Sequence, residues 1–481
     1  MQEKADLLDQ DISRSHDLYD PHTRLKHREQ YVTLIDRLKT IIAPHKRLPH
    51  ELLADIFHLA LPDDFRVRVP CRFFSPAHKR EHALPWSFGH ICSSWRQVAL
   101  TDHRLWNRIR IQVEDLDPLH IQILETVLLR SGSAHLDIEM MANFSFIPVL
   151  DIVLPQAGRI YRLNLHTHLG GLCSFLSEFS TPGRTLSSLT EAILSGSHLE
   201  IPEGGIHIFG DRPLLRKLDI RLEGQSELLE ALCGLHIPFS QLTELTLGVN
   251  SSPHSVLCIL KEMVNLVRCS ITFRDLSRVD DPAFDLVLPH LESLILSSYT
   301  FEILIRILQH ITLPSLLYFW VDCRGPARQR NRQIPGALPS EVLALVDRSS
   351  CHLTHIALEG NLGPVVERLH RSLVSISAGL PASTVQRITY RELTLPHLEE
   401  LNCALEVDTV TDLKNMVEAL WPNGQVGGNV RRKFHSKCKI VCGRSVGKEE
   451  LCRWEQEMKA SLNRLSIEGW VELSCDEVPI T

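Results

Sequence analysis

The chain has 481 residues, of which 44% are hydrophobic and 23% are charged, and its formal net charge is −7. These values are ordinary for a soluble globular protein, and they favour neither a nucleic-acid-binding protein nor a protein of anionic membrane surfaces. The length predicts several domains or one extended repeat body.

The first ten residues, MQEKADLLDQ, are charged and lack the apolar stretch of a secretory signal. No uncharged apolar run reaches the length that crosses a bilayer. The thirteen cysteines are scattered through apolar segments and do not form a spaced disulfide framework. We therefore expect a cytoplasmic or nuclear protein with reduced cysteines and no cofactor.

Residues 1–44 are predicted to form an N-terminal helical segment. Tyr31, Leu34, Leu38 and Ile41 recur at helical spacing, and Pro44 ends the pattern. A helix that packs beside the following domain is favoured over a dimerising coiled coil, because the apolar stripe is short.

Residues 45–110 contain three short apolar segments that form one compact unit. The first follows Leu48-Pro49 and has the helical pattern of HELLADIF, the second contains Cys92 and Trp95, and the third is Leu105-Trp106. A unit of this size cannot bury every apolar face by itself, and a leftover apolar surface marks a partner.

The order LP-x-ELL-x-x-IF, C-x-x-WR-x-x-A and LW resembles the F-box, and is closest to the F-box proteins of mushroom-forming (basidiomycete) fungi. The resemblance implies that this unit binds a Skp-type adaptor of a cullin-based ubiquitin ligase. Two features depart from the family: a long basic insert from Arg66 to Pro85, and His103 where proline is usual. The residues implied in adaptor binding are Leu48, Pro49, Leu52, Leu53, Ile56, Phe57, Cys92, Trp95, Leu105 and Trp106.

Residues 111–405 carry an internal repeat with the core pattern L-x-x-L-x-L, beginning at Ile160. The first six spacings between copies are 24 to 29 residues, and the last two are 37 and 45. Units of this period resemble leucine-rich repeats, in which stacked strands form a parallel sheet on the concave face. We expect an α/β solenoid that follows the helical unit. The copies begin at Ile160, Leu189, Leu215, Leu242, Leu266, Leu291, Leu316, Leu353 and Leu398.

Residues that alternate with the core positions are expected on the concave face, where a protein substrate would bind. Arginine and aromatic side chains are favoured at such interfaces. Residues 406–481 show a weaker pattern and are expected to form a C-terminal repeat or capping region. The candidate substrate-binding residues are Arg162, His166, Lys217, Arg221, Arg268, Tyr318, Trp320 and Asp322.

Three further patterns have the form of catalytic or metal-binding motifs. Gly443-Arg-Ser-Val-Gly447 has the form of a nucleophile elbow, but no histidine follows Ser445. His166-x-His168 at a strand end could bind a metal in a closed barrel. The spacing of His435, Cys438 and Cys442 lacks the paired C-x2-C of a zinc knuckle. We expect no catalytic residue and no metal.

The sequence therefore predicts a non-catalytic adaptor that joins a cullin-based ligase core to a protein substrate, without nucleic acid or membrane as partners. Two alternatives remain open: a leucine-rich-repeat scaffold outside any ligase, and a metal-dependent hydrolase that uses His166 and His168.

Overall fold

The computed structural model divides into two compact units, which comprise residues 1–111 with 115–136 and residues 112–114 with 137–481. No helix of the described part is long and apolar enough to cross a bilayer. In the predicted N-terminal segment, residues 1–44, the structure describes residues 29–30 and 32–35, and these are helical. The structure describes residues 29–30, 32–35, 48–69, 84–113, 116–142, 147–167, 172–179, 185–196, 205–206, 208, 214–222, 232–274, 284–323, 337–380, 382–407, 410–421, 432–440, 448–465 and 467–475.

The first unit combines short helices with one pair of parallel strands. Val67 to Val69 of β1 pair with Ile109 to Ile111 of β2. The unit extends beyond the predicted boundary at residue 110, because α5 belongs to it. Its elements are α3 (His50–Ala60), β1 (Val67–Val69), η3 (Trp86–His90), α4 (Ser93–Thr101), η4 (His103–Leu105), β2 (Arg108–Gln112) and α5 (Pro118–Arg130).

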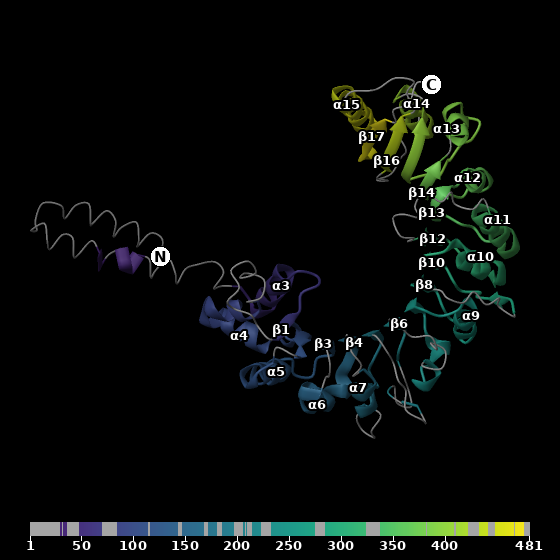
Figure 1. Cartoon of the computed structure of the whole chain (residues 1–481). Helices are drawn as coiled ribbons and strands as arrows, with labels where there is room; N and C mark the ends of the chain where they lie inside the picture. Colours follow the sequence, from purple (N-terminus) through teal and green to yellow (C-terminus); the bar gives the residue numbers. More distant parts are fainter. Residues whose placement is uncertain are drawn as a thin grey trace, which may run out of the picture. The chain divides into compact units, whose positions relative to one another are not determined.

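The second unit is a repeat α/β fold whose strands lie side by side in chain order (Figure 1). The described pairs from β4 to β17 are all parallel. Its main strands are β3 (Leu136–Ala142), β4 (Ile160–Thr167), β5 (Glu191–Gly196), β6 (Lys217–Leu222), β7 (Glu244–Val249), β8 (Arg268–Phe273), β10 (Ser293–Ser298), β12 (Tyr318–Cys323), β13 (His355–Asn361), β14 (Ser375–Leu380), β15 (Glu400–Val407), β16 (Arg432–Ile440) and β17 (Ile467–Cys475).

Helices α6, α7 and α9 to α13 lie along one side of this sheet, and we call the opposite side the open face (Figure 1). Two short strands, β9 (Leu286–Val287) and β11 (Ile311–Thr312), form a separate parallel pair. The other elements are α6 (Ile147–Val153), η6 (Leu154–Arg159), α7 (Leu172–Glu178), η7 (Phe239–Gln241), α9 (Pro253–Lys261), α10 (Phe301–His310), α11 (Ala337–Ser349), α12 (Gly363–Leu369), α13 (Ala382–Thr389), α14 (Val410–Leu420) and α15 (Lys448–Arg464).

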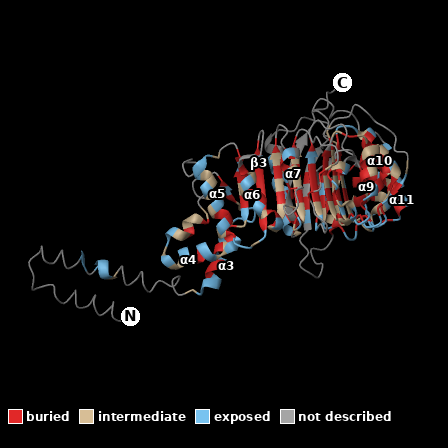
Figure 2. Ribbon diagram, turned by 90° about the horizontal axis from the view of Figure 1, so that it is seen from below, coloured by how far each residue is buried: buried red, intermediate tan, exposed pale blue. Residues whose placement is uncertain are grey.

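The core of the second unit lies between the sheet and these helices, as the alternation of buried and more exposed positions along the strands shows (Figure 2). In β4, Leu163 and Leu165 are buried, whereas Arg162 and Asn164 are not. Stacking places the equivalent buried residue of the next strand beside each of them, so that one apolar layer runs through successive repeats.

Backbone hydrogen bonds at the start of each strand join it to the preceding repeat. The N–H of Thr190 donates to the carbonyl of Tyr161 over 2.8 Å, and the N–H of Thr243 donates to that of Arg216 over 2.9 Å. Equivalent hydrogen bonds join the following repeats as far as Lys433, whose N–H donates to the carbonyl of Glu399 over 2.8 Å. Each of these turns into a strand is thus tied to the preceding repeat, which satisfies backbone groups near the core.

The long predicted spacing between the copies at Leu353 and Leu398 contains an additional repeat. Strand β14 lies between β13 and β15, with Ile376 between Ile356 and Leu401 in the register. The C-terminal region also continues the same sheet, because β16 and β17 pair in parallel with their predecessors.

Candidate functional site

Helix α3 presents two apolar faces, and only one of them is used by the fold. The helix begins after Pro49, whose carbonyl accepts a hydrogen bond from the N–H of Leu53 over 3.0 Å. The side chains of Leu53 and Phe57 are 0% and 1% exposed. On another face, Leu52, Ile56 and Leu59 are 52%, 41% and 87% exposed. We call these three residues the α3 stripe, because their i, i+4, i+7 spacing places them along one side of the helix.

An aromatic cluster holds the buried face of α3. The rings of Phe57 and Phe88 stack at 4.3 Å, and Trp95 lies 4.9 Å from Phe57. Trp86 and Trp106 form an edge contact at 4.7 Å. Trp86 and Phe88 are not among the predicted site residues, although both are large aromatics directly before the Cys92–Trp95 motif. The core of the unit is therefore complete without the α3 stripe.

Arg130 at the end of helix α5 makes cation–π contacts with two tryptophans of this cluster. The guanidinium of Arg130 lies 4.4 Å from the Trp86 ring centroid and 4.6 Å from that of Trp106. The indole N–H of Trp106 donates to the carbonyl of Ala99 over 2.6 Å. Burial lowers the pKa of Arg130, but an arginine remains charged at neutral pH and keeps its cation–π contacts.

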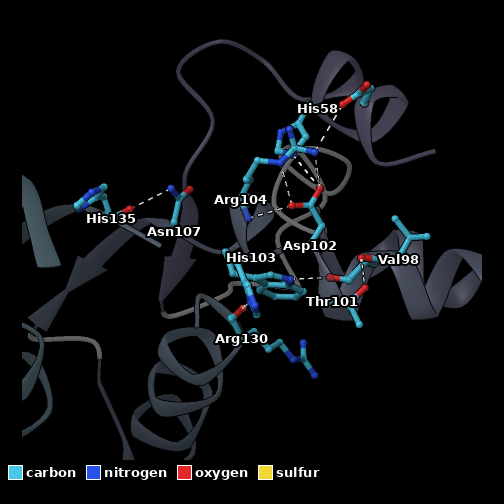
Figure 3. Close-up of polar contacts among 12 residues, drawn as sticks. His58, Val98, Thr101, Asp102, His103, Arg104, Asn107, Arg130 and His135 are labelled. Atoms are coloured by element: carbon cyan, nitrogen blue, oxygen red, sulfur yellow. Dashed lines mark hydrogen bonds and ion pairs between the residues drawn. The ribbon is translucent and has the colours of Figure 1, made fainter. Parts of the chain in front are cut away.

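Asp102 fixes the turn between α4 and η4 to helix α3 (Figure 3). Its carboxylate lies 3.1 Å from His58 Nε2 and accepts hydrogen bonds over 3.1 Å from the N–H and the Nε of Arg104. Burial acts to raise the pKa of Asp102, but the hydrogen bonds and charge of Arg104, with the charge of His58, hold it below the usual range. Arg104 also lies 3.5 Å from the exposed Asp55 of α3. This ion pair is a second contact between the turn and α3, in addition to the contact between Asp102 and His58.

His103 connects the same turn to α5 (Figure 3). Its Nδ1 lies 2.6 Å from the carbonyl oxygen of Arg130. The ring lies against Gly132, where an added Cβ would approach the ring atoms to 2.7 Å. The side chain thus bonds to the end of α5. Nearby, the side-chain amide of Asn107 donates to the carbonyl of His135 over 3.0 Å.

The residues predicted to bind an adaptor fall into three sets according to their exposure. Leu53, Phe57, Leu105 and Trp106 are at most 2% exposed, so in this structure they support the surface and do not form it. Leu48, Cys92 and Trp95 are half-buried, whereas Pro49, Leu52 and Ile56 are exposed. Of the insert, Val67 and Val69 in β1 are buried, and residues 70–83 lie outside the described part.

On the open face of the second unit, the predicted basic residues belong to a ladder of alternating charge. Arg162, Glu191, Lys217, Glu244 and Arg268 occupy equivalent positions in β4 to β8. The Glu191 carboxylate lies 3.1 Å from both Arg162 and Lys217. Glu244 lies 3.8 Å from Lys217 and also pairs with Arg268. Arg162, Lys217 and Arg268 are therefore each paired with a carboxylate on a neighbouring strand.

The remaining predicted open-face residues have different surroundings. Arg221 forms a two-point ion pair with Asp219, at 2.8 and 3.0 Å. It also lines a cavity of about 560 Å³ together with Arg274 and Tyr299. His166 is half-buried beside Ser195 in the register. Tyr318 and Trp320 are 46% and 54% exposed, and Asp322 follows them on the same face of β12.

No metal centre is found among the residues that the structure describes, since no three His, Cys, Asp or Glu side chains there are placed to hold one ion. His168, Cys442 and the Gly443–Gly447 segment lie outside that part of the chain.

Comparison with known proteins gives no family assignment. No protein-family model matches the chain, and no curated protein is similar to it. A crystal structure of a protein from Bacteroides fragilis, solved by a structural genomics consortium, is similar over 56% of this chain and 68% of its own length, with 13% identity and a TM-score of 0.32.

Proposed function

We propose that the chain is the substrate-recognition adaptor of a cullin-based ubiquitin ligase, in which the first unit is an F-box that binds a Skp-type adaptor. The α3 stripe is the observation that carries this proposal. Leu52, Ile56 and Leu59 are exposed although the core beneath them is complete. Such a row of large apolar side chains is costly in water and is typical of a surface that a partner covers.

The second unit, in this proposal, is a leucine-rich-repeat solenoid whose open face binds a protein substrate. Its parallel strands and regular register support this assignment. The chain itself performs no bond chemistry. It acts by positioning, because a substrate held near the conjugating enzyme has a high effective concentration there.

Gel filtration of the purified chain with a purified Skp-type adaptor tests the proposal. The proposal predicts one co-eluting complex of equal stoichiometry, to which a cullin subunit adds. The Leu52→Ala, Ile56→Ala double variant should elute apart from the adaptor. The Leu119→Ala, Leu129→Ala double variant is the matched control, because it removes two leucines that are 61% and 80% exposed on α5 of the same unit.

The second candidate is a repeat scaffold outside any ligase, in which the F-box-like helices serve the chain's own fold. The burial of Leu53, Phe57, Leu105 and Trp106 favours this candidate. Failure of the folded wild-type chain to bind any Skp-type adaptor would select it.

A further inference from the structure

The cavity of about 560 Å³ at strands β6 to β8 is lined mainly by residues that can donate hydrogen bonds. Arg221 and Arg274 line it, and the described residues of its lining include no aspartate or glutamate. Such a lining favours a ligand whose polar atoms are acceptors. The residues that bring a hydroxyl group to the lining are Thr246, Ser270, Thr272, Ser298 and Tyr299.

Gly248 of β7 leaves a gap in the row of side chains that faces this cavity. In the register it has Arg221 on one side and Thr272 on the other. These two neighbours are two strand spacings apart, about 10 Å. A Cβ added at Gly248 would lie 3.5 Å from Arg221 Cγ, which is an ordinary contact, so the backbone at this position does not require glycine. The missing side chain leaves room for a ligand group between the two neighbours.

Asp219 fixes the guanidinium of Arg221 beside this gap. Its carboxylate accepts hydrogen bonds from Nε over 3.0 Å and from Nη2 over 2.8 Å. The Asp219 side chain is 9% exposed, whereas that of Arg221 is 51% exposed. The pair occupies one side of the guanidinium, and the N–H groups of Nη1 are outside it. Since Asp219 balances the charge of Arg221, the cavity offers donors in fixed positions and not a large excess of positive charge.

The donors come from three neighbouring strands. Arg221 lies on β6, Thr246 on β7, and Ser270 and Thr272 on β8. A phosphate group has acceptor oxygens in several directions, whereas the two oxygens of a carboxylate lie in one plane. The guanidinium also matches two phosphate oxygens in shape. Arg274 has a further interaction within the chain, so Arg221 and the three hydroxyl groups are the main donors.

We propose that this cavity binds a phosphate monoester. The phosphate lies over Gly248, accepts hydrogen bonds from Nη1 of Arg221, and accepts others from the hydroxyl groups of Thr246, Ser270 and Thr272. The inference rests on the proposed function in that a phosphorylated ligase substrate would bring the phosphate to the open face. Binding can be measured without the Skp-type adaptor, so loss of adaptor binding through the α3 stripe and loss of phosphate binding are separate outcomes.

The probe is the peptide fluorescein-Gly-Ala-phosphoserine-Ala-Gly-amide, titrated with the full chain at low salt and followed by fluorescence anisotropy. The same peptide with unmodified serine should bind at least about tenfold more weakly, because it lacks the charged acceptors. Competition with free O-phosphoserine distinguishes the source of the phosphate. Displacement only at much higher concentration indicates a phosphorylated protein, and displacement at equal concentration indicates a small phosphorylated metabolite; both results support the site.

Three variants test the proposed donors and the gap. Arg221→Gln should weaken binding of the phosphopeptide about tenfold, and Thr246→Val about threefold, because the first loses a charge-assisted donor and the second a neutral one. Gly248→Val keeps every donor but places a side chain in the gap against Arg221, and it should weaken binding at least about tenfold. Circular dichroism verifies that each variant is folded.

Arg368→Gln is the matched control for the loss of charge, because Arg368 lies on α12 with 66% of its side chain exposed. It should change the Kd less than about twofold, since exposed charges beyond a Debye length are screened. Equal affinity for the serine and phosphoserine peptides, or no binding of the phosphopeptide, would overturn the proposal. Wild-type affinity in folded Arg221→Gln and Gly248→Val would do so as well, because the phosphate would then bind elsewhere.

Discussion

His58 Nε2 and Asp102 Oδ2 lie 3.1 Å apart and join helix α3 to the turn that follows α4. Only 10% of the Asp102 side chain is exposed, and the same carboxylate accepts three hydrogen bonds from Arg104. This connection supports the orientation of the α3 stripe that the aromatic packing sets, because it links α3 to the part of the chain that carries the tryptophan cluster.

Replacing Asp102 by Asn should destabilise the first unit by about 1–3 kcal/mol, since a shielded, charge-assisted acceptor is lost. Urea unfolding followed by tryptophan fluorescence measures the effect, because Trp86, Trp95 and Trp106 all lie in this unit. Asp55→Asn is the control: its side chain is 64% exposed, and its pair with Arg104 should contribute less than about 1 kcal/mol. Equal effects of the two substitutions would contradict this role for Asp102.

The pH dependence of stability should also report on Asp102. Its pKa in the folded chain is lowered from the ordinary 3.8, so the unfolded chain binds the proton more tightly. The stabilisation is therefore present above pH 3.8 and is lost as the pH falls through the lower, folded-state pKa. Unfolding midpoints of the wild type and Asp102→Asn should converge on acidification, and parallel curves would contradict the assignment.

The charge ladder predicts a salt-sensitive effect on the second unit. Glu191→Lys would place a new cation between Arg162 and Lys217, so that three positive charges lie side by side, and should lower the thermal midpoint. Added salt should recover part of the loss, because it screens like charges on the surface. Glu262→Lys, at the exposed end of α9, is the control and should leave the midpoint unchanged. A loss in Glu191→Lys that salt does not alter would indicate a packing defect instead.

Cysteine reactivity tests the position of the repeat core. Burial raises the pKa of Cys269 to about 12, whereas Cys233 and Cys452 are exposed. Iodoacetamide should therefore modify Cys233 and Cys452 in the native chain and modify Cys269 only after denaturation. Rapid native labelling of Cys269, detected by peptide mass spectrometry, would contradict its place in the core.

The repeat period makes most of the parallel strands predictable. The repeat that contains β14 does not match the leucine pattern, and the reason lies in its core residues. Leu373, Ile376 and Ala378 fill the three core positions around β14. The sequence LVSISA matches the pattern only if isoleucine and alanine replace the two later leucines. This repeat also follows Leu353 after an unusually short interval, so the sequence alone indicates one long repeat there.

The ion pairs of the charge ladder are a second feature that the sequence alone does not predict. Arg162, Lys217 and Arg268 are predicted as substrate-binding residues because each is basic and faces away from the core. Their partners Glu191 and Glu244 lie on neighbouring strands, and this pairing depends on the register between repeats. Likewise, helical spacing places Leu52, Leu53, Ile56 and Phe57 on one helix, but the packing of Phe88 and Trp95 decides which side is buried.

The α3 stripe is tested most directly by isothermal titration of a Skp-type adaptor into the Leu52→Ala, Ile56→Ala and Leu119→Ala, Leu129→Ala double variants. Phe57 is unsuitable for this purpose, because truncating it would cost about 3–5 kcal/mol of stability. We predict that the first variant binds at least about thirtyfold more weakly than the wild type, a loss of about 2 kcal/mol, and that the second binds like the wild type. Equal affinity of both variants, or no binding by the folded wild type, would contradict the account.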